Sequence, residues 1–413
     1  MVSPFLPDDE KLAAIRQALP ALSAGIYLNT GSAGPLPRET AKAMADLAEY
    51  ELTVGRGAPD YHLQAIERMA EARAAVAAIL TADVDTVALT HSTTDGMNAA
   101  AWGLDWRPGD RAVTSNLEHA GGMAPLLALR DRLGVDLRVV DVGDGGDDER
   151  IVAAFEAAID VRTRLVAISH VAWTTGAILP VGEIAEIAHR AGAFVLVDGA
   201  QAAGAIPVDV SALAADAYAV GAQKWLLGPE GMGALWVAPW AADRLRPTFA
   251  GYFGFDQPGT RLPYRPFADA RRFEWGNYHR PSVLGFARSC GWLAMFVGLD
   301  YVYRRGAALG RRTADALAAI GGVEVISPRD KLGPLVTFRI AGWPADEALD
   351  ELGRRAFAIA RTVPDTDRLR LSVGFFNTEA ELDRVAAIVA ELAAHTPQTL
   401  PPRPSLTILG EID

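Results

Sequence analysis

One carboxylate and one lysine have the chemistry and the setting of a reactive pair. The run Val195-Leu-Val-Asp198 consists of apolar residues that end in an acid, which predicts a buried strand with Asp198 at its carboxyl end. A second short apolar run, 216–220, leads to Lys224. Lysine is scarce in this chain, which otherwise carries its positive charge on arginine. The lysines are Lys11, Lys42, Lys224 and Lys331.

Arginine would serve for any solvated cation, but it cannot bond covalently to an aldehyde, whereas a desolvated lysine with a lowered pKa can. A buried acid beside such a lysine suits pyridoxal 5'-phosphate (PLP), because a neighbouring carboxylate keeps the pyridine nitrogen protonated. The pair therefore predicts a PLP site with Lys224 on the aldehyde and Asp198 at the ring nitrogen. Asp198 alone is also typical of an ordinary strand end, so the hypothesis needs the further residues below.

Strand-like and helical patterns alternate along much of the chain, and they must position this pair. Strand patterns at 111–115, 137–142 and 163–169 alternate with helical patterns such as 181–191. This alternation predicts an α/β fold with a mostly parallel sheet and helices on both faces. Ligands in such folds lie beyond the carboxyl ends of the strands. The polar residues at such ends are Thr93, Thr94, His119, Ser169, Asp198 and Lys224.

Some of these residues have ordinary alternatives. Thr93 and Thr94 follow a strand pattern and precede a helical run. Their hydroxyls and the free backbone N–H groups could bind a phosphate, or a hydroxyl could simply cap the helix. A lone histidine such as His119 is more often a surface or core residue than a ligand. The residues by themselves leave both alternatives open.

The order of these motifs resembles the class V aminotransferase and cysteine desulfurase family of fold-type I PLP enzymes, from about Tyr27 to about Leu392. The similar segments are Thr93-Thr94-Asp95, Glu118-His119, Ser169-His170 and 272–277, with Asp95 and Asn277 in place of the family's glutamate and threonine. The resemblance implies a large domain with a mostly parallel sheet flanked by helices and a smaller C-terminal α+β domain. It also implies a homodimer with shared active sites.

The resemblance further implies a role for each motif residue. In this interpretation His119 stacks on the cofactor ring, Gln201 faces its phenolic oxygen, and Asn277 reaches the phosphate of a neighbouring subunit. The catalytic residues are Lys224, Asp198 and His119. The cofactor-binding residues are Thr93, Thr94, His119, Ser169, Asp198, Gln201, Gln223, Lys224 and Asn277.

The substrate end has its own candidates. Arg370 lies in a segment similar to the family's carboxylate-binding segment, and a planar guanidinium makes two parallel bonds to a carboxylate. A surface salt bridge is the ordinary alternative for Arg370. Arg361 is a second candidate. Ser32 and Ala33 lie in a turn of small residues that leaves room for an amino acid, although a plain tight turn has the same composition.

Departures from the family bear on the reaction. Trp173 stands where many desulfurases carry an asparagine, and Gly221 and Gln223 replace serine and histidine phosphate ligands. The stretch between Arg361 and Arg370 has no cysteine, although persulfide transfer needs a thiol nucleophile there. We therefore expect a C–S lyase that releases pyruvate and ammonia from a cysteine-type amino acid. An isopenicillin N epimerase-like epimerase, an aminotransferase and a PLP-fold protein without turnover stay open as alternatives.

The composition argues against several other classes of protein. The 413 residues carry a formal net charge of −12 and no basic block, which argues against a nucleic-acid surface. No apolar run is long enough to span a membrane, and the amino terminus does not read as a signal peptide. The one cysteine, Cys290, excludes a cysteine-based metal cluster. We expect a cytoplasmic enzyme that acts on a small amino acid substrate and has no metal.

The patterns also suggest where the domains divide. We expect a helical N-terminal segment, 1–25, that packs on the small domain, followed by the large PLP-binding domain at 26–280. The small domain should occupy 281–395, with a proline-containing extended tail at 396–413.

Overall fold

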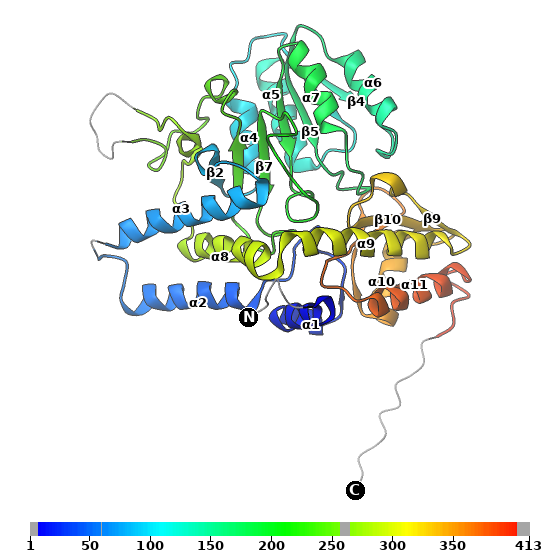
Figure 1. Ribbon diagram of the computed structural model, residues 1–413. Coiled ribbons are helices and arrows are strands. Elements are labelled where there is room, and N and C mark those ends of the chain that lie inside the picture. Colours follow the sequence, from blue (N-terminus) through cyan, green and yellow to red (C-terminus); the bar gives the residue numbers. More distant parts are fainter. Residues whose placement is uncertain (1–6, 59, 257–264, 403–413) are drawn as a thin grey trace.

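The computed structural model describes residues 7–58, 60–256 and 265–402, and Figure 1 shows their arrangement. A large sheet with flanking helices forms the upper part of this view, and a smaller sheet with its own helices lies at the lower right. Two separate apolar clusters fill the two parts. The expected α/β architecture is confirmed.

The large sheet has seven strands in the order β2-β8-β7-β6-β5-β3-β4. Strand β8 runs antiparallel to both of its neighbours, and the other pairings are parallel. Every residue of β6 is buried, as expected for a strand covered by helices on both faces. The strands are β2 (Val87–Thr90), β3 (Arg111–Ser115), β4 (Asp136–Val140), β5 (Thr163–Ser169), β6 (Phe194–Asp198), β7 (Ala217–Gly221) and β8 (Gly233–Val237).

Helices alternate with these strands, as the pattern predicted. They are α4 (Thr93–Gly103), α5 (Ala120–Leu133), α6 (Asp148–Ala158) and α7 (Val181–Arg190). Helix α5 begins at Ala120 and continues through Pro125. His119 provides the N-cap of α5, so the helix starts directly at a predicted site residue.

Three helices form a layer beneath the large sheet in Figure 1: α2 (Arg38–Thr53), α3 (Tyr61–Leu80) and α8 (Arg280–Gly291). The buried side chains of Val283, Phe286 and Cys290 on α8 belong to the core of the large domain. The packing therefore departs from the boundary expected at 281, because α8 buries its apolar face against α2 and α3. A π-helical turn, Trp292–Val297, then leads into the long helix α9 (Leu299–Ala318).

The small domain has an antiparallel sheet in the order β12-β13-β10-β9. Its strands are β9 (Val323–Val325), β10 (Leu335–Ile340), β12 (Arg361–Val363) and β13 (Arg368–Ser372), and its helices are α10 (Ala345–Ala356) and α11 (Glu379–Ala393). Thr378 and Glu381 form a reciprocal capping box at the start of α11. This box satisfies backbone N–H groups that the first turn of a helix leaves without partners.

The N-terminal segment joins both domains. Helix α1 (Asp8–Ala18) places Ile15 in the large core, while its Arg16 pairs with Glu381 of α11 at 2.7 Å. Strand β1 (Ile26–Tyr27) pairs in parallel with β11 (Ala358–Ile359), and Ile26 lies in the small core. The start of the chain therefore bridges the two domains, and residue 26 does not begin the large one.

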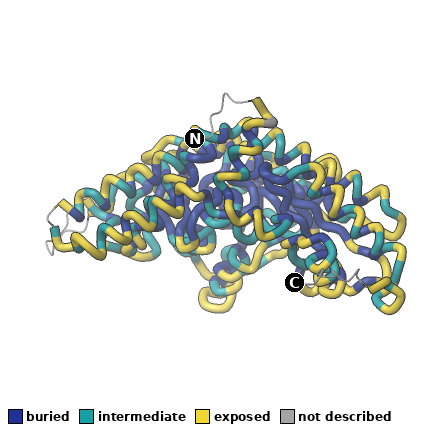
Figure 2. The backbone as a smooth tube through the Cα atoms, turned by 90° about the horizontal axis from the view of Figure 1, so that it is seen from below, coloured by how far each residue is buried: buried dark blue, intermediate teal, exposed yellow. Residues whose placement is uncertain are grey.

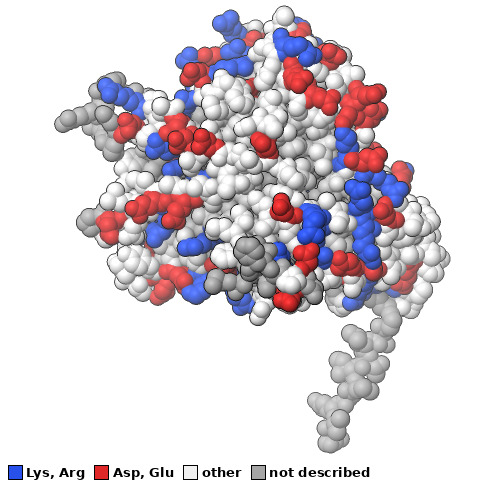
Figure 3. Space-filling model, in the orientation of Figure 1, with Lys and Arg blue, Asp and Glu red and all other residues white. Residues whose placement is uncertain are grey.

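The tail is described as far as residue 402. Residues 396–400 form a turn whose Leu400 packs against the small core, so this part is not extended. Residues 403–413 of the predicted tail lie outside the described residues. Figure 2 shows buried strands at the centre with exposed helical turns around them. On the face seen in Figure 3, acidic and basic side chains are interspersed.

No single described helix is long and apolar enough to cross a membrane, although the bent pair 280–297 and 299–318 together has a suitable length and apolar composition. Within the described ranges, no group of three or more His, Cys, Asp or Glu residues is placed to hold a metal ion.

Candidate active site

Asp198 and Lys224 come from neighbouring strands of the large sheet. Asp198 is the last residue of β6 and is 6% exposed, and Lys224 lies in the turn that follows β7. Burial lowers the pKa of Lys224 to about 8; the charge of Asp198 opposes this shift, and those of Arg370 and Arg361 add to it. Above that pH the amine is mostly neutral, as attack on an aldehyde requires.

His119 is held as a neutral ring beside this pair. Its Nδ1 accepts a hydrogen bond from the backbone N–H of Gly121 at 3.0 Å. An accepting Nδ1 carries no proton, so the neutral ring has its hydrogen on Nε2. Partial burial lowers the pKa of His119, and the charge of Lys224 lowers it further. The ring meets the indole of Trp173 edge-on, with 5.2 Å between the ring centroids.

The phosphate candidates gather at the start of α4. Ser92 caps this helix by accepting the backbone N–H of Asp95 at 3.1 Å, so neither Thr93 nor Thr94 is the cap. Among the described residues, the backbone N–H groups of Thr93 and Thr94 have no hydrogen-bond partner. Free N–H groups at a helix start are suited to an anion. This observation favours the phosphate interpretation over simple capping.

Gly221 lies close to two of the phosphate candidates. A Cβ at Gly221 would lie 2.8 Å from Oγ1 of Thr93 and 3.0 Å from Oε1 of Gln223. The structure therefore brings Thr93 and Gln223 together beside Gly221, where a side chain would overlap the Thr93 hydroxyl. The free N–H groups, the small residue at 221, the partly buried Lys224 and the buried Asp198 fit a phosphorylated pyridine aldehyde.

The variant Gly121→Ala tests this assignment. Its added Cβ would overlap Oγ1 of Thr94 and lie 3.2 Å from Nδ1 of His119. Overpacking of this kind costs roughly 1–3 kcal/mol, so we expect PLP affinity to fall by about tenfold or more. A titration of the apoprotein, followed by visible absorbance, would measure it. The control Gly182→Ala adds a Cβ with no atom within 4 Å; equal affinities for both variants would contradict the assignment.

Glu118 is part of the Glu118-His119 motif, but the sequence predicted no role for it. Its Oε2 accepts a hydrogen bond from Oγ of Ser169 at 2.6 Å, and its Oε1 accepts one from Oγ of Ser115 at 2.7 Å. The predicted ligand Ser169 therefore donates to Glu118. Burial raises the pKa of Glu118 to about 7; both serine bonds lower it, and the charge of Asp198 raises it. Its place directly before His119 was the available signal.

This raised pKa predicts how stability depends on pH. Since the ordinary value is 4.5 and the folded value about 7, the folded state holds an extra proton between these pH values. The free energy of unfolding should therefore fall by roughly 3 kcal/mol as pH rises through this window. Glu118→Gln should remove this part of the pH dependence. Urea unfolding at pH 5 and pH 7.5 would measure it.

The exposed Glu149 offers a matched control, because Glu149→Gln makes the same chemical change at the surface. We expect it to retain the pH dependence of the natural protein. An undiminished dependence in Glu118→Gln would contradict the assignment to the buried carboxyl.

Most of the hydrogen-bonding capacity of the Gln201 side chain is used within the protein. Its Nε2 donates to the carbonyl oxygen of Gly31 at 2.8 Å, and its Oε1 accepts from Nε1 of Trp225 at 2.8 Å. An amide nitrogen carries two hydrogens, so one donor remains for a ligand oxygen. Trp173, at the family's asparagine position, instead donates from Nε1 to the carbonyl oxygen of Glu118 at 3.2 Å. The phenolic-oxygen role of Gln201 stays a prediction.

The substrate candidates converge on one hydroxyl. Oγ of Ser32 accepts a bond from Nη2 of Arg370 at 3.0 Å and one from Nη1 of Arg361 at 3.2 Å. Arg370 is 1% exposed, so it is no surface salt bridge. The carbonyl oxygen of Ala33 accepts a bond from the hydroxyl of Tyr27 at 2.7 Å, which closes the small-residue turn on itself.

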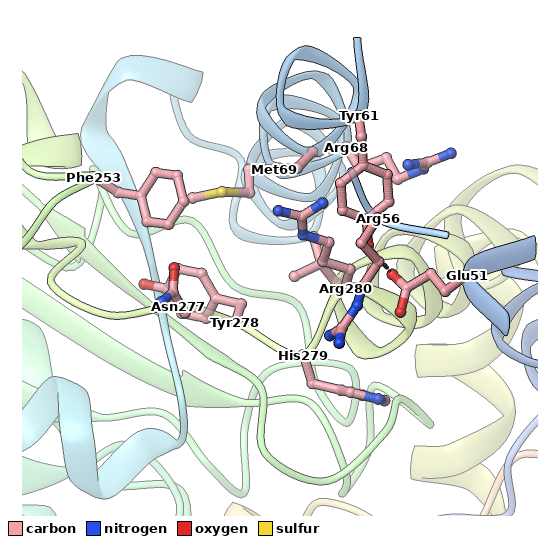
Figure 4. Close-up of a pocket in the computed structure, with 12 residues that line it drawn as sticks. Glu51, Arg56, Tyr61, Arg68, Met69, Phe253, Asn277, Tyr278, His279 and Arg280 are labelled. Carbon is pink, nitrogen blue, oxygen red and sulfur yellow. Dashed lines mark hydrogen bonds between the residues drawn. The ribbon is translucent and has the colours of Figure 1, made fainter. Parts of the chain in front are cut away.

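Asn277 lies near the start of α4, since its carbonyl oxygen is 3.4 Å from Nε2 of His91. It lines a cavity of about 380 Å³ (Figure 4), and none of the other predicted site residues is among its described lining. Arg280 lies against the ring of Tyr61 in this cavity, 3.8 Å from the centroid, and Arg56 and Arg68 also line it. A role of Asn277 in a second subunit stays a prediction.

Comparisons with known proteins agree with this geometry. The profile of the class-V aminotransferase family matches residues 26–385. A probable cysteine desulfurase of Methanothermobacter thermautotrophicus is 30% identical over 399 residues, which cover 92% of this chain and 97% of that relative. The isopenicillin N epimerase of Streptomyces clavuligerus is 31% identical over 377 residues, covering 87% of this chain and 93% of that protein.

Solved structures are also similar. The cystine C–S lyase C-DES, in complex with its product cysteine persulfide, has a TM-score of 0.84 and 26% identity, covering 90% of this chain and 99% of that one. A C-DES variant with glycine linked to its PLP cofactor has a TM-score of 0.85 at 26% identity, covering 91% of this chain and 99% of that one. The fold is that of fold-type I PLP enzymes, and PLP is the cofactor. This chain belongs to the class-V aminotransferase family of PLP-dependent enzymes.

Proposed function

We propose that this enzyme is a C–S lyase, which eliminates the sulfur substituent of a cysteine-type amino acid and releases pyruvate and ammonia. The observation that carries the proposal is the lack of a usable thiol. Cys290, the one cysteine of the sequence, is fully buried in α8, and burial raises the pKa of its thiol. A buried, protonated thiol is a poor nucleophile.

The hairpin of β12 and β13 supports the same conclusion. Persulfide transfer would need a cysteine on a loop between Arg361 and Arg370, but these residues are Cα partners across a short antiparallel pair. Oγ1 of Thr366 closes its turn with a bond to the carbonyl oxygen of Val363 at 2.8 Å. With no thiol to accept sulfur, the sulfur substituent leaves into the solvent.

The residues of this chain divide the reaction between them. PLP, when bound, supplies an electron-accepting ring that spreads the negative charge left at the α-carbon of the substrate. Lys224 removes the α-proton on its Nζ, and Asp198 holds the proton on the ring nitrogen. Arg370 binds the substrate carboxylate and orients the C–H bond toward Lys224. The Cβ–S bond then breaks, and its electron pair leaves with the sulfur. Water supplies the keto oxygen of pyruvate as the nitrogen is released as ammonia.

The cofactor contacts belong to the same proposal. Thr93, Thr94 and Gln223 hold the phosphate, and the His119 ring covers the face of the pyridine. We also propose a homodimer in which Asn277 reaches the phosphate of the partner subunit. Sedimentation velocity of the holoenzyme would test the dimer, and a monomer at micromolar concentration would contradict it.

The test of the reaction uses purified holoenzyme. L-cysteine, L-cystine and cysteine sulfoxides would each be offered, with pyruvate release followed beside the visible spectrum of the cofactor. Pyruvate with multiple turnovers is the expected result. A spectral change without pyruvate would overturn the lyase proposal and leave the PLP site intact.

Epimerisation is the second candidate, because an isopenicillin N epimerase is 31% identical to this chain. It would use the same proton removal and return the proton to the opposite face. Incubation in D₂O separates the two reactions: epimerisation gives deuterated amino acid of both configurations without pyruvate. Release of keto acid only in the presence of an amino acceptor would indicate an aminotransferase instead.

A further inference from the structure

Two arginines face one another at the substrate end of the candidate site. Arg361 on β12 and Arg370 on β13 are direct Cα partners in the antiparallel pair. Like charges placed directly opposite each other on neighbouring strands are destabilising. The fold nevertheless holds both guanidinium groups on the same acceptor, Oγ of Ser32, at 3.2 and 3.0 Å.

Neither arginine has an anionic partner in the described part of the chain. Arg370 also donates to the carbonyl oxygen of Trp173 at 2.9 Å, and Arg361 donates to that of Thr362 at 3.1 Å. These acceptors are all neutral. No carboxylate of the described residues lies within 4.0 Å of either guanidinium group, and the buried Nε of Arg370 has no partner at all.

The positive charges of Arg361 and Arg370 are not balanced by any described acidic group nearby. Burial lowers the pKa of Arg370 to about 9, and the charge of Arg361 lowers it further. An uncompensated buried charge is costly, and a hydrogen-bonded counterion removes most of that cost. One α-carboxylate brings one negative charge, which suits a bidentate contact with Arg370. The positive charge of Arg361 is then left without a counterion.

The positions of the two arginines suggest how the charges are shared. Both lie against the indole of Trp173, with Cζ at 5.8 Å from the ring centroid for Arg361 and 6.0 Å for Arg370. Arg370 is buried, whereas Arg361 is partly exposed. The deeper guanidinium is therefore suited to the α-carboxylate, and the shallower one to a group farther from the α-carbon.

We propose that the substrate carries a second acidic group at the end of its side chain, and that Arg361 binds this group while Arg370 binds the α-carboxylate. This inference rests on the proposed lyase function, and it narrows the substrate class to cysteines whose sulfur substituent ends in a carboxylate or sulfonate. The leaving group is then a thiolate that carries its own acid group.

The test compares two ligands of nearly equal size. S-carboxymethyl-L-cysteine carries a second carboxylate, and S-carbamoylmethyl-L-cysteine carries a neutral amide in its place. Binding to the holoenzyme is measured from the visible spectrum of the cofactor, and turnover from pyruvate release. A charge-assisted contact should favour the acid by about 10- to 100-fold in both Kd and kcat/KM.

For each variant we compare the acid with the amide as a ratio of Kd values and of kcat/KM values, because a general loss of affinity cancels in such a ratio. In Arg361→Gln we expect the preference for the acid to fall to about twofold or less, since a neutral amide replaces the charge. Arg361→Lys should retain part of it. The matched control is Arg368→Gln on the same hairpin, because Arg368 pairs with Asp144 at 2.8 Å. The control should preserve the full preference.

The outcomes separate this inference from the function on which it rests. Equal Kd values for the two ligands in the natural enzyme would overturn the second acid site, whatever the turnover. A preference that survives in Arg361→Gln would overturn the role of Arg361. Spectral preference for the acid without pyruvate from either compound would support the acid site and overturn the lyase reaction.

Discussion

Lys224→Ala is expected to lower turnover by about three orders of magnitude or more, since the lysine is both the covalent anchor of the cofactor and the base for the α-proton. The variant should still fold. Burial lowers the pKa of Lys224, which means that the site disfavours the charged amine, so removal of the amine should not lower the free energy of unfolding. The measurement is pyruvate release at saturating PLP, with the visible spectrum recorded on the same sample. The absorbance band of the lysine-bound cofactor should be absent.

Two comparisons make this prediction specific. Lys42→Ala removes a lysine whose exposed side chain pairs with Asp46 at 2.6 Å on the surface of α2, and such a pair is worth little, so activity should be retained. A small primary amine added to Lys224→Ala should restore part of the turnover, because it replaces the missing base. Full activity of Lys224→Ala without added amine would contradict the enzymatic function proposed here.

Asp198→Asn is expected to lower kcat by about 10- to 1,000-fold, because a carboxylate at contact distance shifts the pKa of its partner by roughly 1–3 units. The amide has the same shape, and its Oδ1 can still accept the bond from the backbone N–H of Ala200, which is 2.9 Å in the natural protein. The loss should therefore reflect charge and not fold. Steady-state turnover with matched PLP occupancy measures it.

A cofactor analogue gives the control for this variant. PLP methylated on its ring nitrogen carries a permanent positive charge and has no need of a carboxylate to hold a proton. We expect it to recover activity in Asp198→Asn relative to PLP, while it should bring no gain in the natural enzyme. Loss of activity with both cofactors would mean that Asp198 acts on something other than the ring nitrogen.

Local patterns were sufficient for much of the fold and for the central pair. Apolar runs identified the strands that end at Ser169 and Asp198, since a strand buried on both faces must be apolar along its length. The alternation of strands and helices predicted the parallel part of the sheet. The chemical difference between lysine and arginine identified Lys224. These properties depend on neighbouring residues in the chain, so the sequence displays them directly.

Contacts between distant segments were not visible in the same way. The parallel pairing of β1 with β11 joins residues 26 and 358, and no periodicity in either segment specifies its partner. The apolar face of α8 would suit either domain, and only the packing against α2 and α3 assigned it to the large one. Both departures from the expected boundaries have this cause.

The same distinction between local patterns and distant contacts applies to the candidate site. From the sequence alone came the identity of the cofactor anchor, Lys224, and of the acid Asp198, because each is recognisable from its residue type and its local setting. Only the tertiary structure decided that Glu118 accepts a hydrogen bond from the hydroxyl of Ser169 and that Arg361 lies directly opposite Arg370. The physical reason is that hydrogen bonds and unbalanced charges arise between side chains that folding brings together, and a linear pattern does not record which of them will meet.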